Sequence, residues 1–241
     1  MLKGHYRNLF TGIILIIVGI ILDFAIQLAG TLANETIAKA INVSRNHWLP
    51  VMGMCLTIAL LLVVTVTILV HAIRKQAPKL GLHPIKAEKL TWVFKGYGLI
   101  LLSGMVTILL QTLITGSRET ANNQQALEDM ANAGGASLLF VVVLAVIVAP
   151  IVEELIFRGV ILNFFFKQGP WWLNIVISGV LFGYFHVYQD FQIFALLQYS
   201  LMGLSLAIVY KKTKQIQYAM LTHMLNNSVA AVALVTMALH H

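Results

Sequence analysis

The chain has 241 residues, of which 59% are hydrophobic and only 10% are charged, and its mean hydropathy is +0.85. A soluble domain usually carries about 25% charged residues, so the composition excludes an ordinary soluble protein and favours one embedded in a lipid bilayer. The net charge of +7 could suggest a nucleic-acid partner. The basic residues lie between apolar stretches, however, where membrane topology explains them, so we expect no nucleic acid. The single cysteine, Cys55, excludes an intrachain disulfide.

Seven apolar stretches approach or exceed the roughly 20 residues that a transmembrane helix needs. They cover residues 9–32, 48–73, 90–114, 137–166, 171–187, 191–210 and 217–239. The sequence therefore predicts an all-α polytopic transmembrane bundle of about seven spans. No polar linker divides it, so we expect one integrated membrane domain. Residues 1–136 would supply three helices and an outer loop, and residues 137–239 the helices that carry the polar motifs described below.

Lysine and arginine placement predicts the orientation. With a cytoplasmic N-terminus, twelve of these residues fall on the cytoplasmic side and three outside, a strong positive-inside bias. The cytoplasmic set is Lys3, Arg7, Arg74, Lys75, Lys79, Lys86, Lys89, Lys95, Lys167, Lys211, Lys212 and Lys214, and the outer set is Lys39, Arg45 and Arg118. The polar loop 115–135 then lies outside the membrane, where it predicts a short surface helix or a flexible cap.

The fourth span carries three charged residues, Glu153, Glu154 and Arg158. A charge at mid-bilayer costs roughly 2.5–3.5 kcal/mol, so three unpaired charges would cost about 8–10 kcal/mol. Residues four apart share a helix face, so Glu154 can pair with Arg158, while Glu153 points elsewhere. Pro150 either kinks the helix and opens room for water near Glu153, or is an ordinary membrane proline.

Asp23 is a further carboxylate in the first span. It either pairs with another group or faces a cavity, and the sequence does not identify its partner.

Two later spans add histidines at a comparable depth. His186 follows Gly179 and Gly183, whose spacing would let another helix approach closely. His186 alone would suit a structural, hydrogen-bonded histidine, but the intramembrane glutamate pair favours a catalytic one. In the last span, His223 and Asn227 share a helix face and can both donate hydrogen bonds, which suits an oxyanion-binding pair. The alternative is a polar clasp between helices.

Three motifs together resemble the CPBP family, the CAAX proteases and bacteriocin-processing enzymes also called the Abi family. They are Glu153-Glu154-x-x-x-Arg158, Phe182-x-x-x-His186 and His223-x-x-x-Asn227, in the expected order within residues 137–233. The resemblance implies that Glu153 activates water with His186 as its partner, and that His223 and Asn227 stabilise an oxyanion. Glu154 and Arg158 complete the first motif and are counted with the catalytic set.

The resemblance implies an intramembrane endopeptidase that cleaves a membrane-associated protein or peptide, such as a CAAX protein, a pheromone or a bacteriocin leader, in a bacterial plasma membrane. We expect a metal-independent mechanism. A zinc-dependent alternative would use Glu153, His186 and His223 as ligands. Two hypotheses lie outside the protease class. One is a non-catalytic bacteriocin self-immunity or sensor-regulating membrane protein, and the second is a proton-coupled transporter, which the lack of an internal repeat disfavours.

Overall fold

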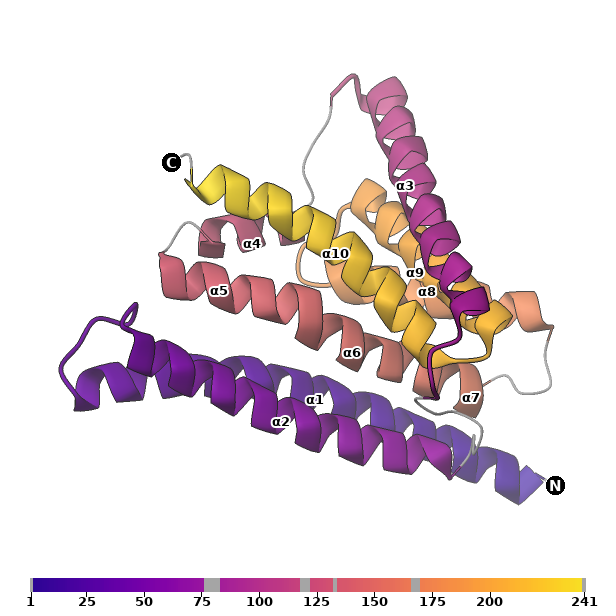
Figure 1. The fold of residues 1–241 in the computed structure, drawn as a ribbon. Helices are drawn as coiled ribbons and strands as arrows, with labels where there is room; N and C mark the ends of the chain where they lie inside the picture. Colours follow the sequence, from indigo (N-terminus) through magenta and orange to yellow (C-terminus); the bar gives the residue numbers. More distant parts are fainter. Residues whose placement is uncertain (1, 76–82, 118–121, 132–133, 166–169, 240–241) are drawn as a thin grey trace.

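The computed structural model describes residues 2–75, 83–117, 122–131, 134–165 and 170–239, and every regular element in these ranges is helical (Figure 1). The all-α prediction is confirmed. Six helical segments are long and apolar enough to cross a membrane: Asn8–Ala40, Trp48–Arg74, Ala87–Thr115, Gly135–Phe164, Ile193–Thr213 and Ile216–Ala238. The seventh predicted span is the shorter apolar helix α8 (Trp171–Val187), whose 17 residues lie at the lower limit for a span.

The N-terminal helices α1 (Leu2–Ala40) and α2 (Trp48–Arg74) form an antiparallel hairpin, which makes one layer of the molecule (Figure 1). Glycines bring the two helices close together. A Cβ on Gly30 would lie 2.8 Å from Ile58 Cγ1, and one on Gly53 would clash with Ile37. The inner face of the hairpin joins the main hydrophobic core through residues such as Ile26 and Met54.

The middle layer is one long, irregular helix that contains the glutamate pair. It consists of α5 (Gly135–Val143), the π-helix η1 (Leu144–Val148), α6 (Ala149–Glu154), the π-helix η2 (Leu155–Ile161) and α7 (Leu162–Phe164). π-Helical turns are rare and frequently mark functional sites. The sequence leaves open either a kink or an ordinary membrane proline at Pro150, and in the structure the π-helix η1 ends two residues before this proline.

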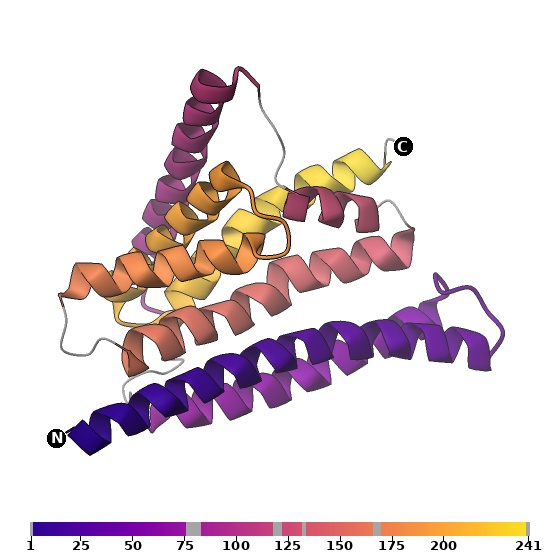
Figure 2. The same ribbon diagram turned by 180° about the vertical axis from the view of Figure 1, so that it is seen from behind.

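The third layer contains α8, α9 (Ile193–Thr213) and α10 (Ile216–Leu239), with α3 (Ala87–Thr115) packed on the outside of α9 and α10 (Figure 2). α8 and α9 pack very closely at the predicted glycine face. A Cβ on Gly179 would lie 2.9 Å from the backbone oxygen of Ser200, and one on Gly183 would lie 2.7 Å from its nitrogen. The close approach predicted from the Gly179–Gly183 spacing is thus confirmed.

The loop after α3 contains the short helix α4 (Asn122–Ala131), as its sequence predicts. Leu127 of this helix packs beside Val141 and Leu234, so α4 rests on the ends of α5 and α10. Residues 118–121 and 132–133 of the same loop, including Arg118, lie outside the described part of the chain.

Candidate active site

Glu154 and Arg158 form a fully buried ion pair at the centre of the bundle. Arg158 Nη1 donates to Glu154 Oε1 at 2.9 Å, and both side chains are 0% exposed. The pairing predicted from their four-residue spacing is confirmed. Arg158 Nη2 also donates to the backbone oxygen of Gly203 on α9, and the guanidinium lies 4.9 Å from the ring centroid of Phe182. The Arg158 charge is therefore neutralised by Glu154, and the guanidinium is held by contacts with Glu154, Gly203 and Phe182.

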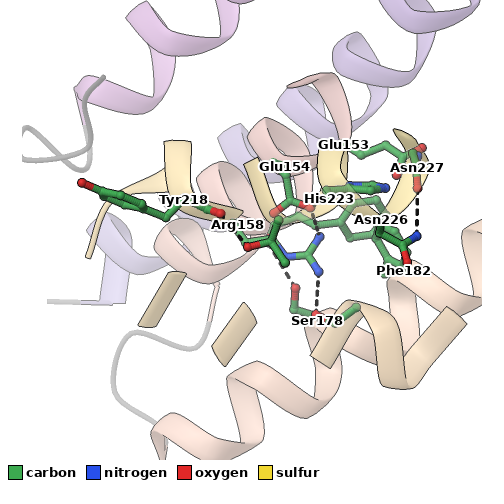
Figure 3. A network of polar contacts seen from close by, with 12 residues as sticks. Glu153, Glu154, Arg158, Ser178, Phe182, Tyr218, His223, Asn226 and Asn227 are labelled. Atoms are coloured by element: carbon green, nitrogen blue, oxygen red, sulfur yellow. Dashed lines mark hydrogen bonds and ion pairs between the residues drawn. The ribbon is translucent and has the colours of Figure 1, made fainter. Parts of the chain in front are cut away.

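His223 of α10 joins the same cluster. Its Nδ1 lies 3.2 Å from Glu154 Oε1, and the residue is 2% exposed. Since the carboxylate is bonded to Arg158, it is an acceptor, and Nδ1 is the nitrogen that carries the proton. Figure 3 shows Glu154 between Arg158 and His223. Helices that are distant in the chain are thus joined by a network of three polar side chains, which the sequence motifs alone do not specify.

Glu153 lies on the other side of the helix and has different surroundings. Its Oε2 is buried and has no hydrogen-bond donor among the described residues. His186 of α8 is a possible ion-pair partner, and its Nε2 lies 3.9 Å from Glu153 Oε2, beyond direct hydrogen-bond distance. Their side chains keep 11% and 14% of their surface exposed, respectively. Glu153 and His186 therefore face each other across a narrow gap that is not fully closed.

The orientation of His186 is fixed by its neighbours. Its Nδ1 lies 2.9 Å from the backbone oxygen of Phe182. The imidazole stacks on Tyr199 at a centroid distance of 4.4 Å and lies 4.5 Å from the Phe182 ring. A carbonyl oxygen can only accept, so Nδ1 donates, and Nε2 of the neutral ring presents a lone pair to Glu153.

Asn227 binds a backbone carbonyl that the π-helix leaves without a partner. Its Nδ2 donates to Ala145 O at 2.7 Å, and Asn226 donates to its Oδ1 at 3.0 Å. In an α-helix Ala149 N–H would bond to Ala145 O, but here it bonds to Leu144 O. The next residue, Pro150, has no N–H to offer. Asn227 is thus a clasp between helices in this state, and its second amide N–H is the one left for a ligand.

The three residues that a zinc ion would need do not form a metal site. Among the described residues, no group of three or more His, Cys, Asp or Glu side chains could hold a metal ion. His223 directs Nδ1 to Glu154, whereas His186 directs Nε2 to Glu153. The arrangement suits two separate acid–histidine pairs better than one metal centre.

Some groups around the site are not evident from the motifs. Gly203 matters through its backbone oxygen and through its lack of a side chain, because a Cβ there would lie 2.8 Å from Phe182 Cβ. Tyr199 matters through its stacking on His186. Only the small-residue pattern on α8 hints that a close neighbour must supply these contacts.

The fold and the site define a polytopic membrane protein with two acid–histidine pairs buried among its helices. Residues 135–229 match the family model described as Type II CAAX prenyl endopeptidase Rce1-like. This range contains all three motifs and the entire candidate site. The match confirms the resemblance to the CPBP family over these residues.

Two bacterial relatives are similar over a longer range. A Bacillus subtilis (strain 168) protein named "Putative membrane peptidase YdiL" is 25% identical over 169 residues, which cover 70% of this chain and 66% of the relative. The "Membrane-embedded CAAX protease MroQ" of Staphylococcus aureus (strain USA300) is 26% identical over 180 residues, covering 71% of this chain and 70% of the relative. The chain thus matches about two thirds of the length of these relatives. No solved structure matches the chain significantly.

Proposed function

We propose that the protein is an intramembrane endopeptidase in which Glu153 activates the attacking water. The observation that carries this proposal is the unsatisfied carboxylate oxygen of Glu153, which is buried and faces the lone pair of His186 across 3.9 Å. Two acceptors so close together need a donor between or beside them. A water molecule has two O–H groups and can donate one to each.

Hydrolysis then follows from this arrangement. The water oxygen bonds to the scissile carbonyl carbon while Glu153 takes up a proton. The same proton passes to the amide nitrogen as the carbon–nitrogen bond breaks, so that an amine and a carboxylic acid leave. His186 holds the water in line and can share the proton, because its Nδ1 is committed to the Phe182 carbonyl.

The second acid–histidine pair would stabilise the oxyanion that forms on the carbonyl oxygen. Glu154 orients His223 through Nδ1, so that a protonated His223 would present its Nε2–H to the negatively charged oxyanion. Arg158 fixes Glu154 in place. Asn227 would add its remaining amide N–H. In a buried, water-poor site such donors act strongly, because little solvent competes with them.

We further propose that this chemistry is metal-independent. The support is the separation of the histidines into two pairs and the lack of a metal-binding group among the described residues. Purified protein should cleave peptide with less than about 0.1 zinc ion per chain and remain active under chelation. Stoichiometric zinc that is lost in both His186→Ala and His223→Ala, together with chelator-sensitive activity, would favour the metal-dependent alternative.

The proposed substrate is a membrane-associated peptide or protein, and the proposed location is a bacterial plasma membrane. The support is the apolar character of the helices around the site and the bacterial origin of both relatives. The particular substrate class named for the family model, prenylated CAAX proteins, is one member of the set to be tested.

The test compares new peptide termini in membranes from cells that carry either the wild-type chain or Glu153→Gln. Peptide pairs from a single cleavage should appear only with the wild-type chain. Glu35→Gln is a matched control, because Glu35 is a partly exposed acid on α1 paired with Lys39 and Arg45. Its membranes should contain the same cleaved pairs as the wild type. Identical termini in all three samples would contradict a peptidase and favour a binding role.

A further inference from the structure

The first transmembrane helix places Asp23 beside the catalytic segment. α1 packs antiparallel to the long, irregular helix formed by α5 to α7. Two glycine contacts fix the register of the two helices. A Cβ on Gly19 would lie 2.7 Å from Ile156 Cγ1, and one on Gly30 would lie 3.4 Å from Phe140 Cε2. Asp23 lies between these two contacts, one turn along from Gly19.

The same register brings Asp23 level with Glu153. One turn back from Ile156 along α6 lies Val152, the neighbour of Glu153. Asp23 and Glu153 are near enough for their charges to interact. The two carboxylates come from regions more than 120 residues apart in the chain, and Asp23 lies outside residues 135–229, which carry the family signature.

Asp23 has one oxygen satisfied and one unsatisfied. Gln27 Nε2 donates to Oδ2 at 2.9 Å. Oδ1 is buried, and no donor for it is found in the described part of the chain. A carboxylate in a transmembrane helix is costly, and a buried acceptor without a donor adds to that cost. The contacts on either side of Asp23, from Gly19 to Ile156 and from Gly30 to Phe140, are apolar, so they give no structural reason for an acid at this position.

The helices that carry Asp23 and His186 lie on different sides of the long helix that carries Glu153 (Figure 2). α1 packs against α6, η2 and α7, whereas α8 packs against η2 and α7 from the other side. Glu153 Oε2 also lacks a donor among the described residues and lies 3.9 Å from His186 Nε2. A ligand that reaches Glu153 therefore meets an acceptor from α1 as well as the histidine from α8.

A peptide that is about to be cleaved supplies the missing donors. Its backbone must be extended at the scissile bond, so its N–H groups lose their helical partners. In hydrocarbon each unpaired N–H costs several kcal/mol. An acceptor at this depth would therefore stabilise the bound, extended peptide. A lysine or arginine side chain would be a less common donor, because such residues are rare in transmembrane segments.

We propose that Asp23 is a substrate-binding residue whose Oδ1 accepts a hydrogen bond from a backbone N–H of the extended peptide. This inference rests on the proposed peptidase function. It makes the N-terminal hairpin part of the substrate site, and it predicts that binding depends on the peptide backbone rather than on a charged side chain.

The experiment uses the full-length protein in detergent and an internally quenched peptide. The peptide has the sequence whose cleavage in membranes is lost with Glu153→Gln. Asp23→Leu should raise KM about tenfold, the effect of losing one hydrogen bond to a charged group, while kcat stays within about twofold. Asp23→Asn keeps an acceptor oxygen and should restore KM to within about threefold of the wild type.

A second set of peptides tests the donor directly. In each peptide one backbone amide near the scissile bond is replaced by an ester, which removes a single N–H. One of these esters should raise KM for the wild-type protein but not for Asp23→Leu, since the partner is then already absent. Thr31→Val is the matched control on α1, because the Thr31 hydroxyl is exposed and, within the described part of the chain, bonds only to Gln27 O of its own helix. It should leave KM unchanged for every peptide.

The outcomes separate the two proposals. If Glu153→Gln cleaves the peptide normally, the proposed function fails, and the inference fails with it. If Glu153→Gln is inactive but Asp23→Leu has a wild-type KM, only the inference is wrong. The inference is also overturned if Asp23→Asn raises KM as much as Asp23→Leu does and no ester peptide distinguishes Asp23→Leu from the wild type. The site would then require the charge of Asp23 rather than an acceptor oxygen.

Discussion

Glu153 and Glu154 are neighbours on one helix, yet the protein treats them in opposite ways. Glu154 accepts from Arg158 and contacts His223, and the cluster is closed to solvent. Each glutamate has one buried oxygen, Oε2, without a donor in the described structure, but Glu153 is not bonded to an arginine and its histidine remains at 3.9 Å. Glu154 has the surroundings of a structural charge, and Glu153 those of a group kept free for chemistry.

The difference teaches that an acidic pair in a membrane need not be a single functional unit. A buried ion pair is tolerated when its geometry and its additional hydrogen bonds are good. Arg158 approaches this condition through its bonds to Glu154 and Gly203 O, which leave its Nε and Glu154 Oε2 without a partner in the described structure. Glu153 has no such bonds in the described structure, so the free-energy cost of burying it must be offset by the stability of the surrounding core.

The largest expected effect is on activity when Glu153 is changed. Glu153→Gln should lower kcat/KM by about 10²–10⁴, the contribution of a general base, because the amide cannot accept the water proton. Its unfolding temperature in detergent should equal that of the wild type, since the change removes a buried charge without altering shape. Near-normal turnover would break the contrast between the two glutamates.

The next effect concerns stability at the Arg158 cluster. Arg158→Ala should lower the free energy of unfolding by about 3–5 kcal/mol, because it leaves the Glu154 charge buried and abandons a large packed side chain. Glu154→Gln should cost less, since its amide oxygen still accepts from Arg158. Thermal melts in detergent test the order. Equal losses for the two variants would mean that Glu154 does not hold the arginine charge.

Replacing Asn227 tests whether a residue that joins two helices also contributes to catalysis. Asn227→Ala should reduce kcat by about 10²–10³ if its second N–H reaches the oxyanion. Its loss of stability should be near 0.6 kcal/mol, roughly the typical value for a polar contact between membrane helices. Asn226→Ala is the matched control, because Asn226 contacts only the oxygen of Asn227 in the described network. An unchanged kcat with reduced stability would make Asn227 a clasp alone.

The smallest effect couples Asn227 to Pro150. Pro150→Ala supplies a backbone N–H next to the π-helical turn, which gives the carbonyl of Ala145 another possible donor. Asn227→Ala should then cost about 0.5 kcal/mol less stability in the Pro150→Ala background than in the wild type. A double-mutant cycle of unfolding free energies measures this coupling. Strict additivity would show that the carbonyl of Ala145 does not depend on the proline.

The parts of the molecule that follow local rules could be predicted from the sequence. Hydropathy predicts the long helices, and four-residue spacing predicts the Glu154–Arg158 pair. The glycine pattern on α8 predicts a close neighbour. Each of these depends on residues within one helix, so no knowledge of the tertiary arrangement is needed.

The rest depends on contacts between distant segments. The partner of His223 is Glu154, 69 positions earlier in the chain, and Gly203 O is reached by an arginine 45 positions away. The π-helical turn η1 leaves the carbonyl of Ala145 without a helical partner, and this is why Asn227 is needed. Helical periodicity assumes a regular 3.6-residue turn, so it cannot reveal these departures or the position of Asp23.

The short length of α8 has a consequence for the surrounding lipid. A helix of 17 residues is about 25 Å long, roughly 5 Å less than an average hydrocarbon core. A bilayer adapts to such a mismatch by becoming thinner beside the helix. His186 lies one residue before the end of α8, so this thinning would bring the lipid–water boundary toward it. The proposed hydrolysis would consume one water per bond, and a local dip in membrane thickness would shorten the path of that water to the protein interior.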